Sequence, residues 1–512
     1  MTSLIESSSP LIEVRSPADG RLVGSVTNHG RAEVRAASAE LRSAQPAWED
    51  LGPNGRRAVL LRWADWILDN DRRLGELAQA ESGKAWGDAA FESTAVVEIV
   101  NYYAKNAAEF LSPRRVKPSG PAGATKRLAV RFRPLPLVGV ITPWNSPLGN
   151  PVLDAIGALM AGAAVLCKPS EVTPMSWTEA VRGFRQDVGG PPILASITGD
   201  GATGEAVVDE VDMVMFTGST RTGRKIAARC GERLIPCSLE LGGKDAMIVL
   251  SDADIDRAVA GATWGAMMNS GQACVSVERA YVEAPVYDEF LEKVTVAVSN
   301  LRMGTDAPGD FSCEVGAMAT LEQVNIVERH VKDAVGRGAR VLTGGQRGQS
   351  GSYFEPTVLA DVDHSMACMH EETFGPTLPV MKVRDEEEAV RLANDSTYGL
   401  SASVWSRDPD RADRVSRRLE VGAVNINNVM VNLFQFGLPQ GGWKDSGVGA
   451  RFGGPNGVLK FCRHQACVSE RINLGSEPYW FPYSARKGRL LARGARLLGA
   501  NDWRRRLGLR PR

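Results

Sequence analysis

The sequence predicts an α/β protein with parallel sheets that are covered by helices on both faces. Between residues 137 and 217, short apolar runs recur, and helical stretches separate them. Strands that alternate with helices form βαβ units and a parallel sheet. Ligands of such sheets bind beyond the carboxyl ends of the strands. The residues directly after each apolar run are therefore the first candidates for a functional site.

Length and composition indicate a globular protein of several domains. The 512 residues exceed what one hydrophobic core holds, and the chain is 43% hydrophobic and 23% charged. A formal net charge of zero gives no general attraction for nucleic acid, so we expect no nucleic-acid partner. No apolar run reaches the roughly 18 residues that a transmembrane helix needs, so we expect no such helix.

The cysteines and histidines predict reduced thiols and no metal site. The 8 cysteines show neither CxxC nor zinc-type spacing, and the first residues lack the basic and apolar segments of a signal peptide. We therefore expect a cytoplasmic protein. The histidines also lack the spacing of metal ligands; they are His29, His330, His364, His370 and His464.

The first part of the chain reads as short strands followed by three helices. Residues 10–30 contain two strand-like runs, and residues 32–51 are rich in alanine. Apolar side chains recur at helical spacing over residues 54–83, which predicts a second helix. A third is expected over residues 91–111, because Pro113 follows it. The proline, glycine and basic residues after it indicate a boundary.

The alternating region predicts four strands of one parallel sheet. The apolar runs that predict them are 137–142, 163–168, 193–197 and 213–217. Helices are expected over 147–161 and from about 174. A glycine-rich turn, Thr217–Gly223, follows the fourth run and offers a helix N-terminus to a phosphate, although it is not GxGxxG. Lys168 and Glu171, after the second run, suit a ribose because one donates and the other accepts hydrogen bonds.

A carboxylate and a thiol follow in the next part of the chain. Glu240 lies between leucines and glycines, where poor solvation raises its pKa toward the range of a general base. Asp252 or Asp254 is expected to cap the helix that leads to Cys274. A free thiol is a few per cent thiolate at pH 7, and its surroundings can raise that fraction, so Cys274 is a candidate nucleophile.

These residues belong to motifs that resemble those of the NAD(P)-dependent aldehyde dehydrogenase superfamily. The motifs appear in the order of that family and extend from residue 10 to about residue 470. The separation of Glu240 and Cys274, 34 residues, also matches the family. The motifs begin at Pro143 (PWN), Lys168 (KPSE), Phe216 (FTGS), Leu239 (LELGGK), Gly271 (GQAC), Glu371 (EETFGP), Asn394 (NDSTYGL) and Val424 (VN).

The resemblance implies a catalytic role for three residues. Cys274 would attack the aldehyde, and the Asn145 amide with the Cys274 backbone N–H would hold the oxyanion of the thiohemiacetal. Glu240 would activate the water that releases a carboxylic acid from the thioester. The family members that transfer the acyl group to CoA lack this glutamate, so hydrolysis is expected.

The resemblance also implies the cofactor site and its preference. A carboxylate at Glu171 favours a free ribose 2′-hydroxyl, so we expect NAD, with NADP as the alternative. Lys168 and Glu171 would bind the adenosine ribose, and Glu372 the nicotinamide ribose. The residues implied in cofactor binding are Thr142, Trp144, Lys168, Ser170, Glu171, Gly218, Ser219, Gly223, Leu241, Glu372 and Phe374.

The aldehyde itself is less well defined by sequence. The residues after Cys274 and the stretch from Phe434 are similar to bacterial succinate-semialdehyde dehydrogenase-like members. Glu171 departs from these members, which often carry a non-acidic residue there. Phe434 and Phe436 would equally line a pocket for an aromatic or fatty aldehyde. A non-catalytic binding protein on the same scaffold is the alternative from another class.

The family fold implies three parts and an oligomer. A Rossmann-like cofactor domain would comprise residues 1–112 and 134–242, and an α/β catalytic domain residues 243–443. Residues 113–133 and 455–475 would form a small β arm for oligomerisation. A homodimer or homotetramer is implied.

The last segment of the chain is strongly basic. Residues 484–512 contain ten Lys or Arg and one acid, Asp502, so the neutral total hides an acidic body. Leu490, Leu491, Leu497 and Leu498 can share a helical face beside the basic residues. This pattern suits weak contact with an anionic membrane surface. The alternative is a tail that is solvated or packed on the acidic body.

Overall fold

The computed structural model describes residues 10–119, 123, 125–349, 351–477 and 479–509. The predicted parts of the chain include several residues outside this description, namely 1–9, 120–122, 124, 350 and 510–512. The chain forms two compact units, which are described separately below. The larger unit comprises Met1–Ala108 with Pro134–Phe461, and the smaller comprises Glu109–Arg133 with Cys462–Arg512.

The first sheet of the larger unit contains the four predicted strands. Its order is β19-β9-β8-β5-β6-β7; β19 is antiparallel to β9, and the other neighbours are parallel. Every residue of β5, β6 and β8 is buried, as expected for strands covered on both faces. The strands are β5 (Leu137–Ile141), β6 (Ala164–Lys168), β7 (Leu194–Ser196), β8 (Met213–Thr217), β9 (Cys237–Glu240) and β19 (Gly447–Val448).

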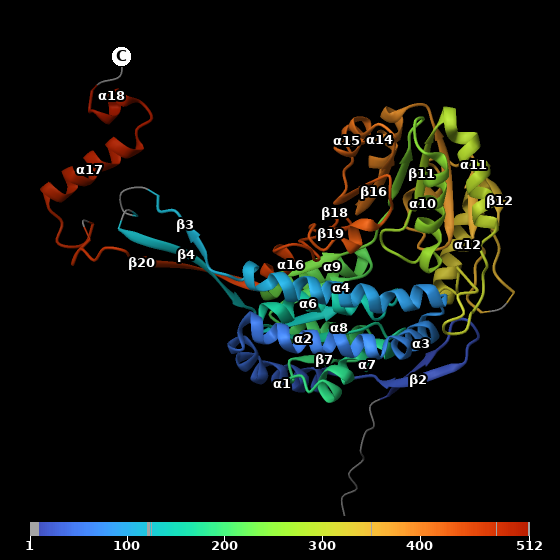
Figure 1. Cartoon of the computed structure of the whole chain (residues 1–512), viewed down its shortest axis with the longest axis horizontal. Helices are drawn as coiled ribbons and strands as arrows, with labels where there is room; N and C mark the ends of the chain where they lie inside the picture. Colours follow the sequence, from blue (N-terminus) through green and yellow to red (C-terminus); the bar gives the residue numbers. More distant parts are fainter. Residues whose placement is uncertain (1–9, 120–122, 124, 350, 478, 510–512) are drawn as a thin grey trace, which may run out of the picture. The chain divides into compact units, whose positions relative to one another are not determined.

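Eight helices of the described chain surround this sheet (Figure 1). A helix is the next element in the chain after each of β5, β6 and β8, as the alternating pattern predicts. The helices are α1 (Arg31–Asp50), α2 (Gly52–Asp69), α3 (Asp71–Ser82), α4 (Trp86–Phe110), α6 (Gly149–Ala161), α7 (Met175–Arg182), α8 (Gly201–Glu210) and α9 (Thr220–Arg233).

Two helix boundaries differ from the prediction. The single helix expected over residues 54–83 is divided at Asn70, whose backbone leaves the helical region (φ −115°, ψ 16°). Its side-chain Nδ2 donates to the Trp66 carbonyl at 2.8 Å and thereby ends α2. The helix expected from residue 91 begins at Trp86, because Asp306 accepts a hydrogen bond from the Trp86 N–H at 2.8 Å. A cap that is distant in sequence leaves no local signal.

A second sheet forms the other half of the larger unit. Its order is β12-β13-β14-β11-β10-β16-β17, and only the β12–β13 pair is antiparallel. Met247 and Val249 of β10 face one apolar cluster, and Ala246 and Ile248 face the other. Its strands are β10 (Ala246–Val249), β11 (Arg279–Glu283), β12 (Arg340–Thr343), β13 (Thr357–Ala360), β14 (Thr377–Val383), β16 (Ser401–Trp405) and β17 (Ala423–Ile426).

Helices cover this sheet on both faces (Figure 1). Asp254 caps the first of them, α10, by accepting a hydrogen bond from the Arg257 N–H. Of the two predicted capping residues, Asp254 is therefore the correct one. The helices are α10 (Ile255–Met267), α11 (Ala284–Ser299), α12 (Leu321–Gly336), α13 (Ala367–His370), α14 (Glu386–Asn394) and α15 (Pro409–Ser416).

In the described residues, the smaller unit contains three strands and two helices. Its sheet has the order β20-β4-β3, with β3 antiparallel to β4. Its elements are β3 (Arg114–Val116), β4 (Lys126–Pro134), β20 (Cys462–Glu470), α17 (Ala485–Gly499) and α18 (Trp503–Arg506). Elsewhere the chain forms the short elements β1 (Leu11–Arg15), β2 (Leu22–Thr27), β15 (Tyr398–Gly399), β18 (Trp443–Lys444) and α16 (Asn456–Leu459). None of the helices within the described residues has the length and apolarity needed to cross a membrane.

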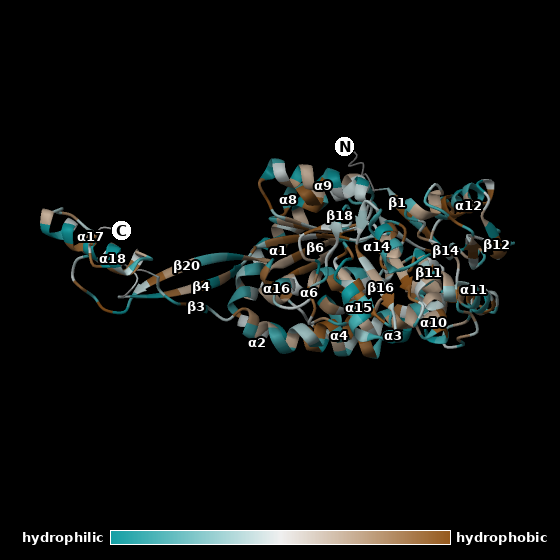
Figure 2. Cartoon of the chain, turned by 90° about the horizontal axis from the view of Figure 1, so that it is seen from above, coloured by the Kyte–Doolittle hydropathy of each residue, from teal (hydrophilic) through white to brown (hydrophobic). Residues whose placement is uncertain are grey.

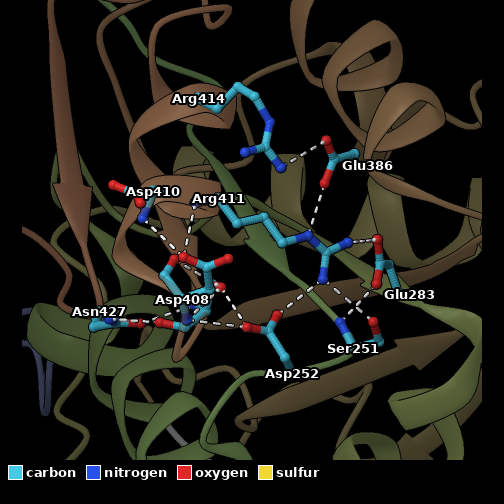
Figure 3. A network of polar contacts seen from close by, with 10 residues as sticks. Ser251, Asp252, Glu283, Glu386, Asp408, Asp410, Arg411, Arg414 and Asn427 are labelled. Carbon is cyan, nitrogen blue, oxygen red and sulfur yellow. Dashed lines mark hydrogen bonds and ion pairs between the residues drawn. The ribbon is translucent and has the colours of Figure 1, made fainter.

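A polar network joins α15 to the ends of β10 and β11 (Figure 3). Arg411 contacts three carboxylates, those of Asp252 at 2.9 Å, Glu283 at 2.7 Å and Glu386 at 2.7 Å. The Glu283 carboxylate is buried and also accepts from the Ser251 N–H at 2.6 Å. Removal of the guanidinium would leave a buried carboxylate without its cation.

We expect Arg411→Met to lower the free energy of unfolding by about 3–5 kcal/mol, because breaking a buried ion pair leaves an uncompensated charge. Arg414→Met is the matched control on the same helix: its side chain is exposed and lies 3.8 Å from Glu386. That control should cost less than about 1 kcal/mol. Urea unfolding monitored by tryptophan fluorescence measures both, and equal effects would contradict the role of the network.

Candidate active site

A cavity of about 690 Å³ lies at the carboxyl ends of β5, β6 and β8. The structure brings most of the predicted cofactor residues together around it. Those that line it are Thr142, Trp144, Lys168, Ser170, Glu171, Gly218 and Ser219. Three basic residues that the sequence did not single out, Arg31, Lys225 and Arg229, also line it. Asp209, which also lines the cavity, pairs with Arg31 at 2.6 Å and with Arg229 at 2.8 Å and offsets part of their charge.

Lys168 is held firmly at the end of β6. Its ammonium donates to the carbonyls of Pro169 and Gly199 at 2.8 and 2.7 Å, and to Glu171 Oε2 at 3.2 Å. Burial lowers the pKa of Lys168, and the nearby Glu171 carboxylate opposes this effect. Because the Glu171 side chain is about half exposed, its carboxylate can accept a hydrogen bond in the cavity, while the three N–H groups of Lys168 are engaged by the contacts above.

The N-terminus of helix α9 lies at the same cavity. Ser219 is its N-cap, with its Oγ accepting from the Thr222 N–H at 3.4 Å. A helix N-terminus beside basic side chains suits a phosphate. Gly223 does not line this cavity; a Cβ there would lie 2.5 Å from Leu241, so its glycine permits close packing of α9.

A second cavity, of about 300 Å³, shares Trp144, Gly218 and Ser219 with the first. Its lining includes five more of the predicted residues, namely Asn145, Leu241, Cys274, Glu372 and Phe374, whereas the predicted Glu240 lines neither cavity. The rings of Trp144 and Phe374 meet edge to face at 5.5 Å. Glu372 accepts from the Gly243 N–H at 2.8 Å, and burial raises the pKa of its carboxyl to about 7.

A third cavity, of about 120 Å³, is lined by Cys274 and Asn145, so the thiol lies where two cavities meet. The backbone before it is left-handed at three successive residues, Asn269 (φ 53°), Ser270 (φ 56°) and Gly271 (φ 70°). A Cβ at Gly271 would lie 2.1 Å from the Gly375 carbonyl oxygen. Only glycine permits this close approach, which turns the chain toward the cavity.

The Asn145 amide is positioned by hydrogen bonds on all sides. Its Nδ2 donates to the Gln272 carbonyl at 2.9 Å, and its Oδ1 accepts from Asn150 Nδ2 at 3.0 Å. Its backbone carbonyl accepts from Asn269 Nδ2 at 2.8 Å and from Lys84 Nζ at 3.0 Å. An amide N–H held in this way beside a thiol is suited to stabilise negative charge on an oxygen bound there.

The surroundings of Cys274 do not favour its thiolate, contrary to the expectation from sequence. Burial raises the pKa of the thiol to about 12. The Arg451 guanidinium lowers it, while the carboxyls of Glu240, Asp245 and Glu372 raise it further. Desolvation and three acidic neighbours therefore outweigh one cation, and these neighbours lie far apart in the sequence.

Glu240 ends β9 and is 3% exposed. Burial raises the pKa of its carboxyl to about 7, while Arg451 lowers it and Asp154 raises it. The direction agrees with the sequence-based expectation. Its Oε2 has no hydrogen-bond partner among the residues that the structure describes. A buried carboxyl with an unused oxygen and a pKa near neutrality is suited to accept a proton from water.

Several residues of the site were missed by sequence reasoning. Arg451 is 4% exposed, forms an ion pair with Asp154 at 2.9 Å and lines the cavity of Cys274. Lys84 and Glu92 form a second buried ion pair in the same lining. Each is a charged residue in a stretch without a recognised motif, so only its position in space indicates a role.

Beside the thiol, the amide donor, the buried carboxyl and the two cavities, the chain shows similarity to known proteins. The Aldehyde dehydrogenase family model matches residues 4–467. The 4,4'-diapolycopene aldehyde oxidase of Methylomonas sp is 41% identical over 472 residues, which is 92% of this chain and 88% of that protein. A Mycobacterium ulcerans (strain Agy99) protein with the provisional name succinate-semialdehyde dehydrogenase (NADP+) 2 is 41% identical, over 86% of this chain and 85% of its own length.

Solved structures agree with the sequence relatives. The crystal structure of a Mycobacterium tuberculosis aldehyde dehydrogenase complexed with NAD+ matches with a TM-score of 0.85 and 33% identity. The match covers 92% of this chain and 96% of that chain. The chain therefore belongs to the aldehyde dehydrogenase family, as an NAD(P)-dependent enzyme that oxidises an aldehyde to a carboxylic acid.

Proposed function

We propose that this enzyme oxidises apolar aldehydes, with Cys274 as the nucleophile, Asn145 as the oxyanion donor and Glu240 as the general base. The position of Cys274 carries this proposal, because its thiol lines both the cavity suited to the nicotinamide and the apolar cavity. Asn145 lines both cavities as well. A substrate carbonyl at this junction meets the sulfur and the amide donor together.

The steps follow from these positions. The Cys274 thiol gives its proton to solvent water, and its sulfur bonds to the aldehyde carbon, whose oxygen becomes the oxyanion held by Asn145 Nδ2 and the Cys274 backbone N–H. NAD(P)+, when bound, accepts the hydride that leaves this carbon. Glu240 then takes a proton from water as the water oxygen attacks the thioester. The carbon–sulfur bond breaks, which frees the carboxylic acid and the Cys274 sulfur.

The cofactor would be held along the first two cavities, whose donor set fits a dinucleotide. Lys168 and Glu171 suit the adenosine ribose, and Ser219 at the N-terminus of α9 suits the pyrophosphate. Glu372 suits the second ribose. We propose NAD as the preferred form, because the Glu171 carboxylate repels a 2′-phosphate. In this division the first sheet serves the cofactor and the second sheet carries the nucleophile.

The cavity beyond Cys274 supports an apolar substrate. Nine of the twenty residues that line it have aromatic or other apolar side chains, and the rings of Phe91 and Phe434 meet edge to face at 5.1 Å. A groove of about 590 Å³ adjoins it and shares Asp88, Phe91 and Met268 with it. The apolar side chains of the groove include Trp264, Met267, Leu301, Phe311 and Val315. A hydrocarbon chain attached to the aldehyde would continue along this path.

The charges of the same cavity argue against succinic semialdehyde. Both cations of its lining are already engaged, Lys84 by Glu92 and Arg451 by Asp154. Asp88 contributes a further carboxyl to the lining. A substrate carboxylate would therefore be desolvated without a free cation to pair with. The name of the Methylomonas relative, 4,4'-diapolycopene aldehyde oxidase, refers to an aldehyde other than succinic semialdehyde, whereas the name of the Mycobacterium ulcerans relative refers to succinic semialdehyde.

The smaller unit supports the remaining proposals, which concern assembly and location. In its sheet, β20 is an edge strand of nine residues with mostly exposed side chains, which suits pairing with another copy in a homodimer or homotetramer. The eight cysteines of the whole chain are all free thiols, which is consistent with a cytoplasmic enzyme.

The basic tail supports weak binding to an anionic membrane surface. Helix α17 has no buried residue and carries both basic and apolar side chains (Figure 2). Leu490 and Leu497 are seven residues apart, so they lie on one side, and both are more than half exposed. The exposed aromatic residues Trp480, Phe481 and Tyr483 precede the helix. Arginines attract acidic lipid by about 1 kcal/mol each, and one such helix binds reversibly.

Initial rates of NADH or NADPH formation over an aldehyde panel test the substrate and cofactor. The panel comprises succinic semialdehyde, benzaldehyde and unbranched aldehydes of increasing length, each with NAD and NADP. We expect kcat/KM to rise about three- to fourfold per methylene until the groove is filled, since each buried methylene contributes about 0.8 kcal/mol. NAD should be preferred, and Cys274→Ala should abolish turnover.

Two variants locate this effect in the groove. Trp264→Ala should lower kcat/KM for the longest aldehydes and leave that for the shortest unchanged, because only a long chain reaches Trp264. Leu68→Ala, which removes a half-exposed leucine of α2, is the matched control and should change neither. A preference for succinic semialdehyde would overturn the apolar proposal and restore the alternative of a distal carboxylate.

The pKa of about 7 for Glu240 predicts the pH dependence of hydrolysis. Only the ionised carboxylate accepts a proton, so thioester hydrolysis should rise with pH, pass half of its maximum near pH 7 and level off above about pH 8. Glu240→Gln should give one rapid equivalent of NADH and then turnover slowed by about 10²–10⁴. The exposed Glu292→Gln is the control; a Glu240→Gln enzyme with unchanged steady-state rate would exclude the proposed base.

Co-sedimentation with vesicles tests the tail. Full-length protein should bind vesicles of 30% phosphatidylglycerol at low salt and release as salt rises, whereas a chain that ends at Tyr483 should not bind. Leu490→Ser/Leu497→Ser keeps the charge and should bind more weakly. Light scattering should show the same dimer or larger oligomer for all three. Truncation that alters the oligomer but not the vesicle binding would place the tail on a partner subunit instead.

A further inference from the structure

Arg451 is a buried arginine that reaches two residues of helix α6. Its Nε donates to Asp154 Oδ1 at 2.9 Å, and its Nη2 donates to Asn150 Oδ1 at 2.7 Å. Asn150 and Asp154 are four residues apart, so both side chains lie on one face of the helix. Arg451 and Asn150 line the apolar cavity together with Cys274.

Asn150 links Arg451 to Asn145, because it forms a hydrogen bond with each of them. Because a guanidinium has donors only, Asn150 must direct its Oδ1 toward Arg451, and its Nδ2 is left to donate to Asn145 Oδ1 at 3.0 Å. Asn145 then presents its Nδ2 on the opposite side, where one N–H donates to the Gln272 carbonyl at 2.9 Å. Arg451 and the Gln272 carbonyl therefore impose the same orientation on the Asn145 amide from its two ends.

Arg451, at the start of this series of hydrogen bonds, is itself held in place. The Asp154 carboxylate accepts from Arg451 at one oxygen and from the Thr217 hydroxyl at the other, at 2.7 Å. The backbone N–H of Arg451 donates to the Gln440 carbonyl at 2.7 Å. A planar guanidinium serves Asp154 and Asn150 at the same time and in fixed directions, which the single ammonium of a lysine does not reproduce.

We propose that Arg451 is a positioning residue for catalysis: acting through Asn150, it holds the Asn145 amide as a donor to the oxyanion formed at Cys274. The inference rests on the proposed role of Asn145 and adds the residues that control it. Preorganised donors stabilise an oxyanion because they need not reorient during the reaction. A donor amide that is held at only one end loses part of this advantage.

The charge of Arg451 has a second effect, which a purely structural arginine would not have. Burial raises the pKa of the Cys274 thiol, and of the charged groups around it Arg451 opposes the rise while Glu240, Asp245 and Glu372 add to it. Arg451 likewise lowers the pKa of Glu240. Loss of the charge should therefore make Cys274 less reactive at a given pH, independently of any substrate.

Four single variants and one double variant separate these effects. Arg451→Lys keeps the charge, and Asn150→Leu keeps Arg451, but both interrupt the series of hydrogen bonds that leads to Asn145. We expect each variant to lower kcat about 10- to 100-fold with little change in KM. Their effects should be less than additive in the double variant, because both substitutions break the same series of hydrogen bonds. Arg451→Met should in addition slow iodoacetamide alkylation of the Cys274 peptide at pH 8 by about tenfold or more. Asn145→Ala is the reference.

The outcomes distinguish the inference from the function on which it rests. Full activity of Asn145→Ala would refute the oxyanion role itself. Loss of activity in Asn145→Ala with full activity in Asn150→Leu would refute the positioning role of Arg451. Alkylation in Arg451→Met at the wild-type rate would also count against it. Arg56→Lys, at a buried arginine that donates to backbone carbonyls, controls for stability and should leave the alkylation rate unchanged.

Discussion

The left-handed turn before Cys274 is the constraint on which the rest of the active site depends. Asn269 and Ser270 adopt positive φ values, which cost non-glycine residues of the order of 1–2 kcal/mol each. Hydrogen bonds from Asn269 to Asp88 and Asn145, and from Ser270 to the Gly316 carbonyl, stabilise this conformation. The turn thereby places the sulfur where the nicotinamide-sized and the apolar cavities meet.

Burial at this junction raises the pKa of the thiol and of the neighbouring carboxyls. The pKa of Glu240 and that of Glu372 are each raised to about 7, and that of Cys274 to about 12, with desolvation as the largest cause in every case. Arg451 is the cation that offsets part of this effect for both Cys274 and Glu240. Low water content strengthens its influence, because charges interact more strongly in a medium of low dielectric constant. One guanidinium thus connects the geometry of the oxyanion donor with the protonation of two reacting groups.

The proposal of an apolar substrate depends on the charged residues that line the cavity beside Cys274. The two cations that line the cavity are each paired with a carboxylate, Lys84 with Glu92 and Arg451 with Asp154, so neither is left for a charged substrate. An apolar aldehyde is the ligand that gains from such a cavity. In the smaller unit, exposed leucines beside arginines on α17 suit a lipid surface, where aldehydes of this kind would collect.

The sequence alone determined the α/β class, the strands from β5 to β8 and the candidate residues of the site. These follow from local patterns: apolar runs, turn residues at strand ends, and motifs that contain Asn145, Glu240 and Cys274. Residues implied in cofactor binding also line the two cavities, apart from Gly223, which packs against Leu241. Each of these signals lies within a few neighbouring positions.

Only the tertiary structure decided the protonation of Cys274, the start of α4 and the part played by Arg451. The thiol pKa depends on burial and on carboxyls that no local pattern connects with it. Helix α4 begins where Asp306, 220 positions later in the chain, accepts the Trp86 N–H. Arg451 reaches Asn150 across 301 positions. The physical reason is common to all three: desolvation and hydrogen bonding depend on distance in space, and a sequence specifies distance only along the chain.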